Sequence, residues 1–275
     1  MIRITTLIEN SPGEHLALRH EHGVSFCVEA HARKVLFDTG QSGNFIENAG
    51  QLRIGLEDIE YVVVSHGHYD HSGGLRALTA VTTKFELVTG AGFFEEKYAE
   101  RNGGYEFLGN NFTRDFLEAS GIRYAELNTS MRELIPGVYA LGNFPRIHAD
   151  ELINPRFKLL RDGSFVADTF DDEIMLVIDT PKGIIALLGC SHPGMRNMLD
   201  AVKDRFKKPI HAVLGGTHLV EASAAGVKAS ADYLTGSDIG TIGVSHCTGT
   251  GAMKILGESE KKYYHNRTGS CLIVL

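Results

Sequence analysis

The stretch His66-Gly67-His68-Tyr69-Asp70-His71 places three imidazoles and one carboxylate within six residues, directly after the apolar run Tyr61-Val62-Val63-Val64. In an extended segment the side chains at i and i+2 point to the same side, so His66 and His68 can bind one ion. Asp70 and His71 lie past the bend and can face a second ion. Chance seldom gathers three of only 13 histidines and an aspartate so closely. The stretch therefore predicts a metal site, because these are the side chains that bind transition metals.

The composition is that of an ordinary soluble globular protein, with 275 residues, 43% of them hydrophobic and 22% charged. No linker-like segment divides the chain, so we expect one domain over residues 1–275 with a substrate-covering insertion at about residues 92–170. The net charge is −7 and the basic residues are scattered, which argues against a nucleic-acid partner. The apolar runs are too short to span a membrane, and the N-terminus lacks signal-peptide features. We expect a cytoplasmic protein; the sequence leaves a homo-oligomer open.

Regular elements are expected in both halves of the chain. Strands are predicted at residues 2–8, 24–30, 34–37, 61–64, 210–214, 239–244 and 270–275, with a hairpin at 173–179 and 184–188. Helices are predicted at residues 43–52, 75–78, 195–206, 224–234 and 251–256. Between residues 92 and 170 turn-forming dipeptides interrupt the pattern, and we expect inserted helices and loops over the site. The whole pattern favours two packed sheets with helices outside.

Three consecutive strands in the second half end in small-residue loops that contain a histidine. The loops are Gly189-Cys190-Ser191-His192-Pro193-Gly194, Gly215-Gly216-Thr217-His218-Leu219 and Ser245-His246-Cys247-Thr248-Gly249. Strand-end loops at one edge of a sheet gather in space, as active sites on rigid scaffolds do. His148 is a reserve ligand, whereas no such context surrounds His15, His20, His22, His31 and His265.

Four cysteines are widely spaced and form no Cys-x-x-Cys pair: Cys27, Cys190, Cys247 and Cys271. Neither a disulfide framework nor a zinc ribbon is indicated. Most are expected to be small buried hydrophobic residues. Cys190 and Cys247 stand apart because each lies close to a strand-end histidine.

These features together resemble the metallo-β-lactamase superfamily. The resemblance is carried by the histidine stretch after an apolar strand, by Phe37-Asp38-Thr39-Gly40 upstream, and by the later strand-end histidines. It implies an αββα sandwich of two mixed β-sheets flanked by helices, with a dinuclear metal site along one edge. The cysteine and histidine loops, with Asn197, are similar to a branch that includes an archaeal dihydropterin synthase. That enzyme joins a dihydropterinylmethyl diphosphate to a ribofuranosylaminobenzene phosphate.

The resemblance implies a division of the ligands between two ions. We assign His66, His68 and His192 to one ion and Asp70, His71 and His246 to the other. The chain departs from the superfamily because no aspartate follows the strand at 184–188 to bridge the ions. Cys190 is a candidate extra ligand, since thiolate binds zinc well, and His148 or His218 could replace His192. Two divalent ions are expected, zinc first, with iron and manganese as alternatives.

Roles outside the metal ligands are assigned to three residues. Asp38 would orient a ligand histidine or Asp70, although it could instead cap the helix that follows. His218 would bind a substrate phosphate or act as general acid, and we assign it, with Asp70, as catalytic. Arg146 is a candidate partner for phosphate or carboxylate, or else an ordinary surface arginine.

The first functional hypothesis is a metal-dependent hydrolase acting on a phosphoester, an ester or a related small molecule, with an anionic substrate. The first alternative is a transferase that condenses dihydropterinylmethyl diphosphate with an arylamine ribose phosphate and releases pyrophosphate. A second alternative is a non-catalytic, metal-dependent sensor of a small molecule. Reduction of oxygen or nitric oxide at di-iron is disfavoured, because the chain has no room for a flavin domain and shows no bridging carboxylate.

Overall fold

The computed structural model describes residues 1–236, 238–259 and 262–275. Its strands are β1 (Ile2–Ile8), β2 (Ser25–Ala30), β3 (Arg33–Phe37), β4 (Tyr61–Val63), β5 (Glu86–Gly90), β6 (Glu96–Arg101), β7 (Gly104–Phe107), β8 (Arg123–Leu127), β9 (Met131–Ile135), β10 (Val138–Leu141), β11 (Phe157–Arg161), β12 (Ser164–Ala167), β13 (Met175–Thr180), β14 (Gly183–Leu188), β15 (Ile210–Gly216), β16 (Thr241–Ser245) and β17 (Cys271–Val274). The helices are α1 (Asn44–Gln51), α2 (Tyr69–Ser72), α3 (Leu75–Leu78), α4 (Arg114–Ala119), α5 (Met195–Phe206), α6 (Ala224–Gly236) and α7 (Thr250–Ser259), with short 3-10 turns η1 (Leu219–Glu221) and η2 (His246–Thr248).

Two large mixed sheets form the centre of the molecule. One has seven strands in the order β17-β1-β2-β3-β4-β5-β8, and the other has six in the order β16-β15-β14-β13-β10-β9. Their inner faces pack against each other through apolar side chains such as Phe37, Val63, Ile178 and Leu187. Truncating Ile178 or Leu187 to alanine would cost about 2–5 kcal/mol, because the close-packed interior cannot fill the space.

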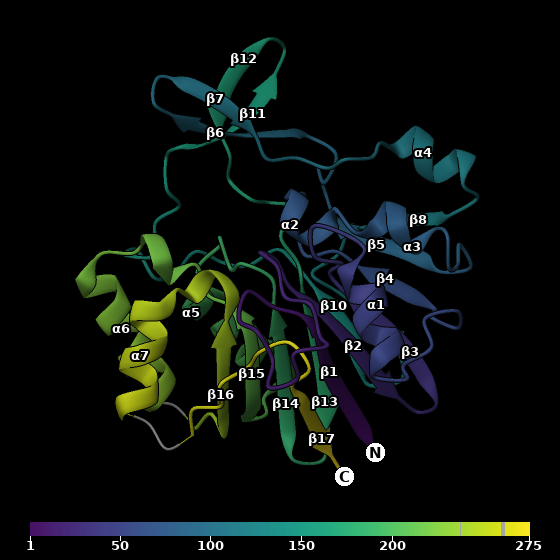
Figure 1. Ribbon diagram of the computed structural model, residues 1–275. Helices are drawn as coiled ribbons and strands as arrows, with labels where there is room; N and C mark the ends of the chain where they lie inside the picture. The colour runs from purple at the N-terminus through teal and green to yellow at the C-terminus, as the bar shows by residue number, and fades with distance from the viewer. Residues whose placement is uncertain (237, 260–261) are drawn as a thin grey trace.

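Helices cover the outer face of each large sheet (Figure 1). Helices α5, α6 and α7 pack on the six-stranded sheet through residues such as Leu199, Leu234 and Leu256. Helices α1, α3 and α4 pack on the seven-stranded sheet through residues such as Phe45 and Leu78. The predicted αββα sandwich is therefore confirmed. Among the described residues, no helix combines the length and the apolar character that crossing a bilayer would require.

Parallel pairing sets where the functional loops lie. Strand β4 lies between β3 and β5 and pairs in parallel with both. In the second sheet β14, β15 and β16 are also parallel neighbours. The carboxyl ends of parallel strands lie at one edge of a sheet, so the loops after β14, β15 and β16 come together. The hairpin of β13 and β14 forms as predicted.

The stretch at residues 92–170 differs from the expectation of inserted helices and loops. Strands β6, β7, β11 and β12 form a third, four-stranded antiparallel sheet, while β8, β9 and β10 extend the two large sheets. Helix α4 is the one helix there among the described residues. The expectation was wrong because Asn102-Gly103 and Asp162-Gly163 are two-residue hairpin turns with positive φ at both positions, and such turns join strands tightly.

The four-stranded sheet, called the small sheet below, lies apart from the sandwich and above α2 in the view of Figure 1. Its own apolar cluster consists of Ala99, Leu108, Phe157 and Phe170. Phe157 and Phe170 also contact the rings of His68 and His192. The small sheet therefore forms part of the wall around the histidines.

Candidate metal centre

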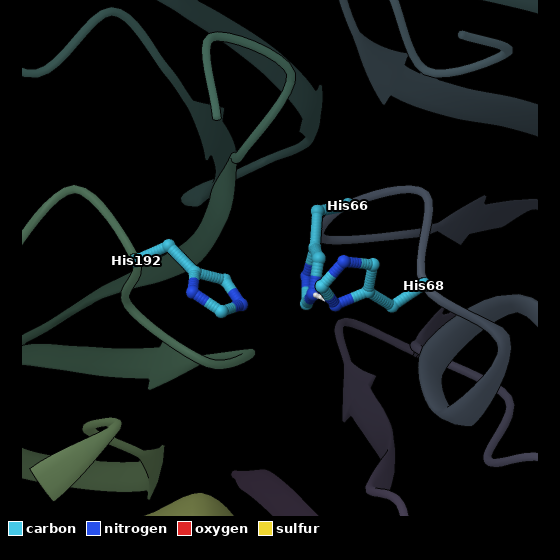
Figure 2. Close-up of side chains that lie close together, drawn as sticks. All are labelled: His66, His68 and His192. Carbon is cyan, nitrogen blue, oxygen red and sulfur yellow. Dashed lines mark hydrogen bonds between the residues drawn. The ribbon is translucent and has the colours of Figure 1, made fainter. Parts of the chain in front are cut away.

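The first group of donors comes from both large sheets. His66 and His68 lie in the loop after β4, and His192 faces them from the loop after β14 (Figure 2). One donor atom from each of the three lies within 4.8 Å of the other two. His66 Nε2 and His68 Nδ1 are 3.0 Å apart. The structure thus brings together the three residues that we assigned to one ion.

Unpaired nitrogens in this group fit a bound cation. The Nε2 atoms of His68 and His192 are buried and have no hydrogen-bond partner among the described residues. Burial, together with neighbouring positive charge, lowers the pKa of His66, His68 and His192 well below the ordinary histidine value. Neutral imidazole is the form that binds metal, so the lowered pKa values favour binding of an ion by these three residues.

The second group surrounds the carboxylate of Asp70. Its Oδ2 lies 3.5 Å from His71 Nε2 and 3.4 Å from His246 Nε2. His22, for which the sequence predicted no role at the site, also joins this group, with its Nε2 3.2 Å from Asp70 Oδ2. No feature of the sequence around His22 marked it, because its approach depends on how the loop between β1 and β2 folds over the edge.

Two cysteines complete the floor of the site. Cys190 Sγ is 3.2 Å from His71 Nε2 and 3.5 Å from His246 Nε2. Cys247 also belongs here, since its sulfur and the donor atoms of Cys190 and His246 all lie within 4.8 Å of one another. The proximity of each cysteine to a strand-end histidine was the signal that pointed to this placement.

Hydrogen bonds orient three of the imidazoles so that Nε2 faces the donor groups. His71 Nδ1 donates to Asp38 Oδ2 over 2.7 Å. His66 Nδ1 lies 3.0 Å from Ser65 Oγ, which itself donates to Asp38 Oδ2. His246 Nδ1 is 2.8 Å from Asn10 Oδ1. Such outer partners fix the tautomer and raise the basicity of the ligand nitrogen.

Asp38 therefore contacts a candidate ligand histidine, His71, as expected for a residue that orients it. Its Oδ1 also accepts the backbone N–H of Ser65 over 2.6 Å, which fixes the start of the histidine loop. Helix α1 begins after Gly43 and has no side-chain cap, so Asp38 does not perform the alternative capping role. Asp70 and Asp38 outweigh the effect of burial on His71 and raise the pKa of His71 to about 9.

Another buried carboxylate supports the loop that carries His192. Glu173 accepts the backbone N–H of His192 over 2.8 Å and also that of Ser191. Burial raises the pKa of Glu173 to about 8, although these two N–H donors oppose the shift. The glutamate fixes the backbone between Cys190 and His192, which the sequence did not reveal.

The donor groups open into a pocket of about 510 Å³. Its wall includes Arg101 at the end of β6 and Arg156 just before β11, and Phe157 and His218 lie beside the histidines. Arg156 is held by Glu221, with Nε donating over 2.8 Å, and its guanidinium lies 4.1 Å from the centre of the Phe157 ring. The Nη1 of Arg156 is buried without a hydrogen-bond partner in the described part of the chain.

His218 lies at the rim and joins none of the donor groups found among the described residues. Its ring is 4.3 Å from that of His192, and its Nδ1 is 3.9 Å from Glu221 Oε2. It also lines an adjoining pocket of about 370 Å³ between the loops before α5 and α6. This position suits contact with a substrate better than replacement of His192.

Two other predicted site residues lie elsewhere. His148 Nε2 is 2.7 Å from Asp200 Oδ2, so the reserve ligand is engaged outside the donor groups. Arg146 donates to the backbone carbonyls of Thr169 and His192, over 2.7 and 3.5 Å, and lines neither pocket. The structure thus gives Arg146 a place in supporting the His192 loop rather than in the pocket wall.

Comparisons with known proteins agree with this geometry. Residues 19–154 match the family model described as the metallo-beta-lactamase superfamily. The chain is 30% identical to the 7,8-dihydropterin-6-methyl-4-(β-D-ribofuranosyl)-aminobenzene-5'-phosphate synthase of Methanocaldococcus jannaschii, over 95% of this chain and 92% of the relative. An uncharacterised protein of the same organism is 28% identical over 89% of this chain and 90% of its own.

Solved structures show the same fold. A crystal structure described as a metal-dependent hydrolase of the beta-lactamase superfamily has a TM-score of 0.86 and 28% identity, and the match covers 100% of this chain and 99% of the other. A diphosphatase from the PhnP family has a TM-score of 0.57 and 13% identity, covering 100% and 98%, which shows a shared fold alone. With the relative at 30% identity over nearly the whole length, the chain belongs to the metallo-β-lactamase superfamily.

Proposed function

We propose that the protein is a dinuclear metal-dependent hydrolase that cleaves a phosphoester, an ester or a related bond in a small anionic molecule. The observation that carries the proposal is the convergence of histidine, cysteine and carboxylate donors, almost all of them buried, in overlapping groups beside one open pocket. His66, His68 and His192 would hold one ion, and Asp70, His71 and His246 the other. Zinc is the proposed metal, with iron or manganese as alternatives.

Two bound divalent ions would lower the pKa of a water molecule toward about 7 and stabilise negative charge that develops on oxygen. The protein's own contribution is to fix the donors, exclude bulk water and position the substrate. Asp38, Ser65 and Asn10 fix the imidazoles through the hydrogen bonds described above. Arg101 and Arg156 line the pocket, paired with Glu106 and Glu221, and their guanidinium groups would donate to an anionic group of the substrate.

The general acid of the proposed reaction is His218. Its ring stands beside His192 at the mouth of the pocket, and Glu221 lies 3.9 Å from its Nδ1. A histidine there can donate a proton to the oxygen of a leaving group. We assign this role to its imidazole, with Arg156 holding the anionic part of the substrate.

The test compares His68→Ala with His265→Ala, an exposed histidine outside the donor groups. The first variant should lose metal, measured by elemental analysis, and at least about a thousandfold in turnover of a phosphoester and ester panel. The second should keep both. Turnover that persists in the metal-free wild-type protein would contradict the proposal. A tightly retained small molecule without any turnover would instead favour a metal-dependent sensor.

A second candidate is favoured by the relative at 30% identity, whose name is that of a synthase. In this transferase the arylamine nitrogen would replace the diphosphate on the methylene carbon of dihydropterinylmethyl diphosphate. The C–N bond forms as the C–O bond breaks, the diphosphate leaves with the electron pair, and the amine proton passes to a base. Pyrophosphate would then appear only when the arylamine ribose phosphate is present. Equal release without the acceptor would favour hydrolysis.

A further inference from the structure

Cys190 occupies a distinctive position between the two groups of donors. It lies just after β14 and is 4% exposed. Its sulfur forms one group with His66 and His71, and another with His246 and Cys247. Among the described residues it is the one that shares a group both with His66, of the first ion, and with His246, of the second. A single atom placed in this way is suited to serve both ions.

The contacts of the sulfur favour a ligand over an ordinary buried thiol. Cys190 Sγ approaches His71 Nε2 at 3.2 Å and His246 Nε2 at 3.5 Å. Both imidazoles direct Nδ1 to a fixed oxygen, on Asp38 and Asn10, so in the neutral form that binds metal their Nε2 atoms are acceptors. One thiol proton cannot satisfy two such acceptors. A cation between the sulfur and each nitrogen satisfies them all.

Cys247 strengthens the preference for a soft metal. Its sulfur accepts the backbone N–H of His218 over 3.2 Å and lies 3.6 Å from the carbonyl oxygen of Cys190. Two sulfurs and the imidazoles beside them form a donor set that suits zinc, ferrous or cobaltous ions. Magnesium and manganese prefer oxygen ligands, and Asp70 supplies the carboxylate of these groups.

We propose that the thiolate of Cys190 bridges the two metal ions and makes the centre selective for zinc-like cations over manganese and magnesium. The proposal rests on the two-ion site of the proposed function and adds the identity of the ligand that joins the two ions. A bridging carboxylate in place of the thiolate would instead favour harder cations such as manganese and magnesium.

Cobalt titration of the metal-free protein tests the bridge without any assay of activity. Thiolate bound to Co²⁺ gives an intense charge-transfer band in the near ultraviolet, whereas imidazole and carboxylate do not. We expect the band to grow until two equivalents are bound. Cys190→Ala should lose most of the band, and Cys271→Ser, a change at an exposed cysteine far along the chain, should keep it.

A second variant covers the case in which Cys190→Ala fails to fold. Cys190→Asp supplies a carboxylate bridge and should still bind two equivalents of cobalt, without the sulfur band. It should also bind Mn²⁺ at least about 10-fold more tightly, relative to Zn²⁺, than the wild type does.

The outcomes distinguish failure of the thiolate bridge from failure of the dinuclear function. Two cobalt ions without a sulfur band in the wild type would overturn the thiolate bridge and leave the dinuclear function standing. A band that survives unchanged in both Cys190 variants would assign the sulfur to Cys247 and also overturn the bridge. A band complete at one equivalent, with no second ion bound, would overturn both proposals.

Discussion

Lys97 Nζ lies 2.9 Å from Asp172 Oδ1, and the other carboxylate oxygen of Asp172 accepts the backbone N–H of Gly67, between the two histidines of the first donor group. Lys97 is 2% exposed and also contacts Asp168 Oδ2 at 2.7 Å. A buried cation on β6 of the small sheet is thus joined to the backbone of the histidine loop. These contacts connect the small sheet directly to the loop that carries His66 and His68.

Replacing Lys97 with methionine should therefore destabilise the protein strongly. Methionine keeps the length of the side chain but leaves two buried carboxylates without their cation, which costs about 3–5 kcal/mol. Thermal denaturation of the metal-free protein measures the effect. Lys158→Met, a partly exposed lysine on the neighbouring strand β11, should change stability by about 0.5 kcal/mol or less. Equal losses of stability in the two variants would show that the buried ion pairs of Lys97 with Asp168 and Asp172 contribute no more than a partly exposed pair does.

Replacing Arg156 with alanine should weaken substrate binding more than it slows turnover. The guanidinium is held by Glu221 and Phe157, and its buried Nη1, which has no hydrogen-bond partner among the described residues, is the atom proposed to meet an anionic group of the substrate. We expect KM to rise about 10- to 100-fold, with kcat changing less, since a charged hydrogen bond contributes about 1.5–3 kcal/mol. Steady-state kinetics provide the measurement. Arg161→Ala, at the exposed end of β11, is the control, and an equal rise in KM there would refute the assignment.

Replacing Asp38 with asparagine should lower metal affinity without removing any ligand. The carboxylate accepts from His71 and from Ser65, and asparagine cannot accept at both of its terminal atoms. Loss of such an outer partner typically costs 10- to 100-fold in affinity. Competition titration with a zinc chelator reports the change. Asp58→Asn, at an exposed aspartate that pairs with Lys34, should leave the affinity as it is.

Replacing His218 with glutamine should slow reactions in proportion to the basicity of the leaving group. A general acid matters most when the departing oxygen holds its negative charge poorly, so alkyl esters should lose about 100-fold in kcat and nitrophenyl esters much less. Metal content should stay at the wild-type value, because His218 joins no donor group of the described residues. A parallel loss of metal would identify His218 as a ligand instead.

Stability of the metal-free protein should depend on pH through His71. Its pKa is raised from the ordinary histidine value to about 9 by Asp70 and Asp38, against the effect of burial. The folded protein therefore holds this proton more tightly than the unfolded chain does, and the resulting stability is complete below about pH 6.5 and lost as the pH rises toward 9. Urea denaturation at a series of pH values should show this decline, and His71→Gln should flatten it.

Zinc affinity should rise over the same range of pH, because the ion must displace the proton from His71. A zinc affinity that is constant from pH 6.5 to 9 would show that His71 is already neutral in the metal-free protein.

The sequence predicted the sandwich and the first donor group because both depend on local patterns. Apolar strands that each end in a histidine loop determine where His66, His192 and His246 lie once parallel pairing is assumed. The small sheet could not be predicted because its strands are short and partly exposed, and because dipeptides such as Asn102-Gly103 are as typical of irregular loops as of hairpin turns.

The remaining site residues could not be predicted from local patterns. Lys97 and Asp172 are 75 positions apart, and His22 meets Asp70 from a loop without regular structure. Their contacts are set by tertiary packing, and no spacing in the chain encodes it. Arg146 shows the converse, since a side chain suited to binding phosphate is used to hold backbone carbonyls.

The donors proposed for each ion come from both large sheets, with His66 and His71 following β4 and His192 and His246 following β14 and β16. A bound metal is therefore a cross-link between the two halves of the sandwich at their open edge. Binding to the folded state alone adds about 2.7 kcal/mol of stability when the free ion is at 100 times its Kd. Removal of the metal by a chelator should then lower the free energy of unfolding by that amount, and the two sheets should separate more readily at this edge.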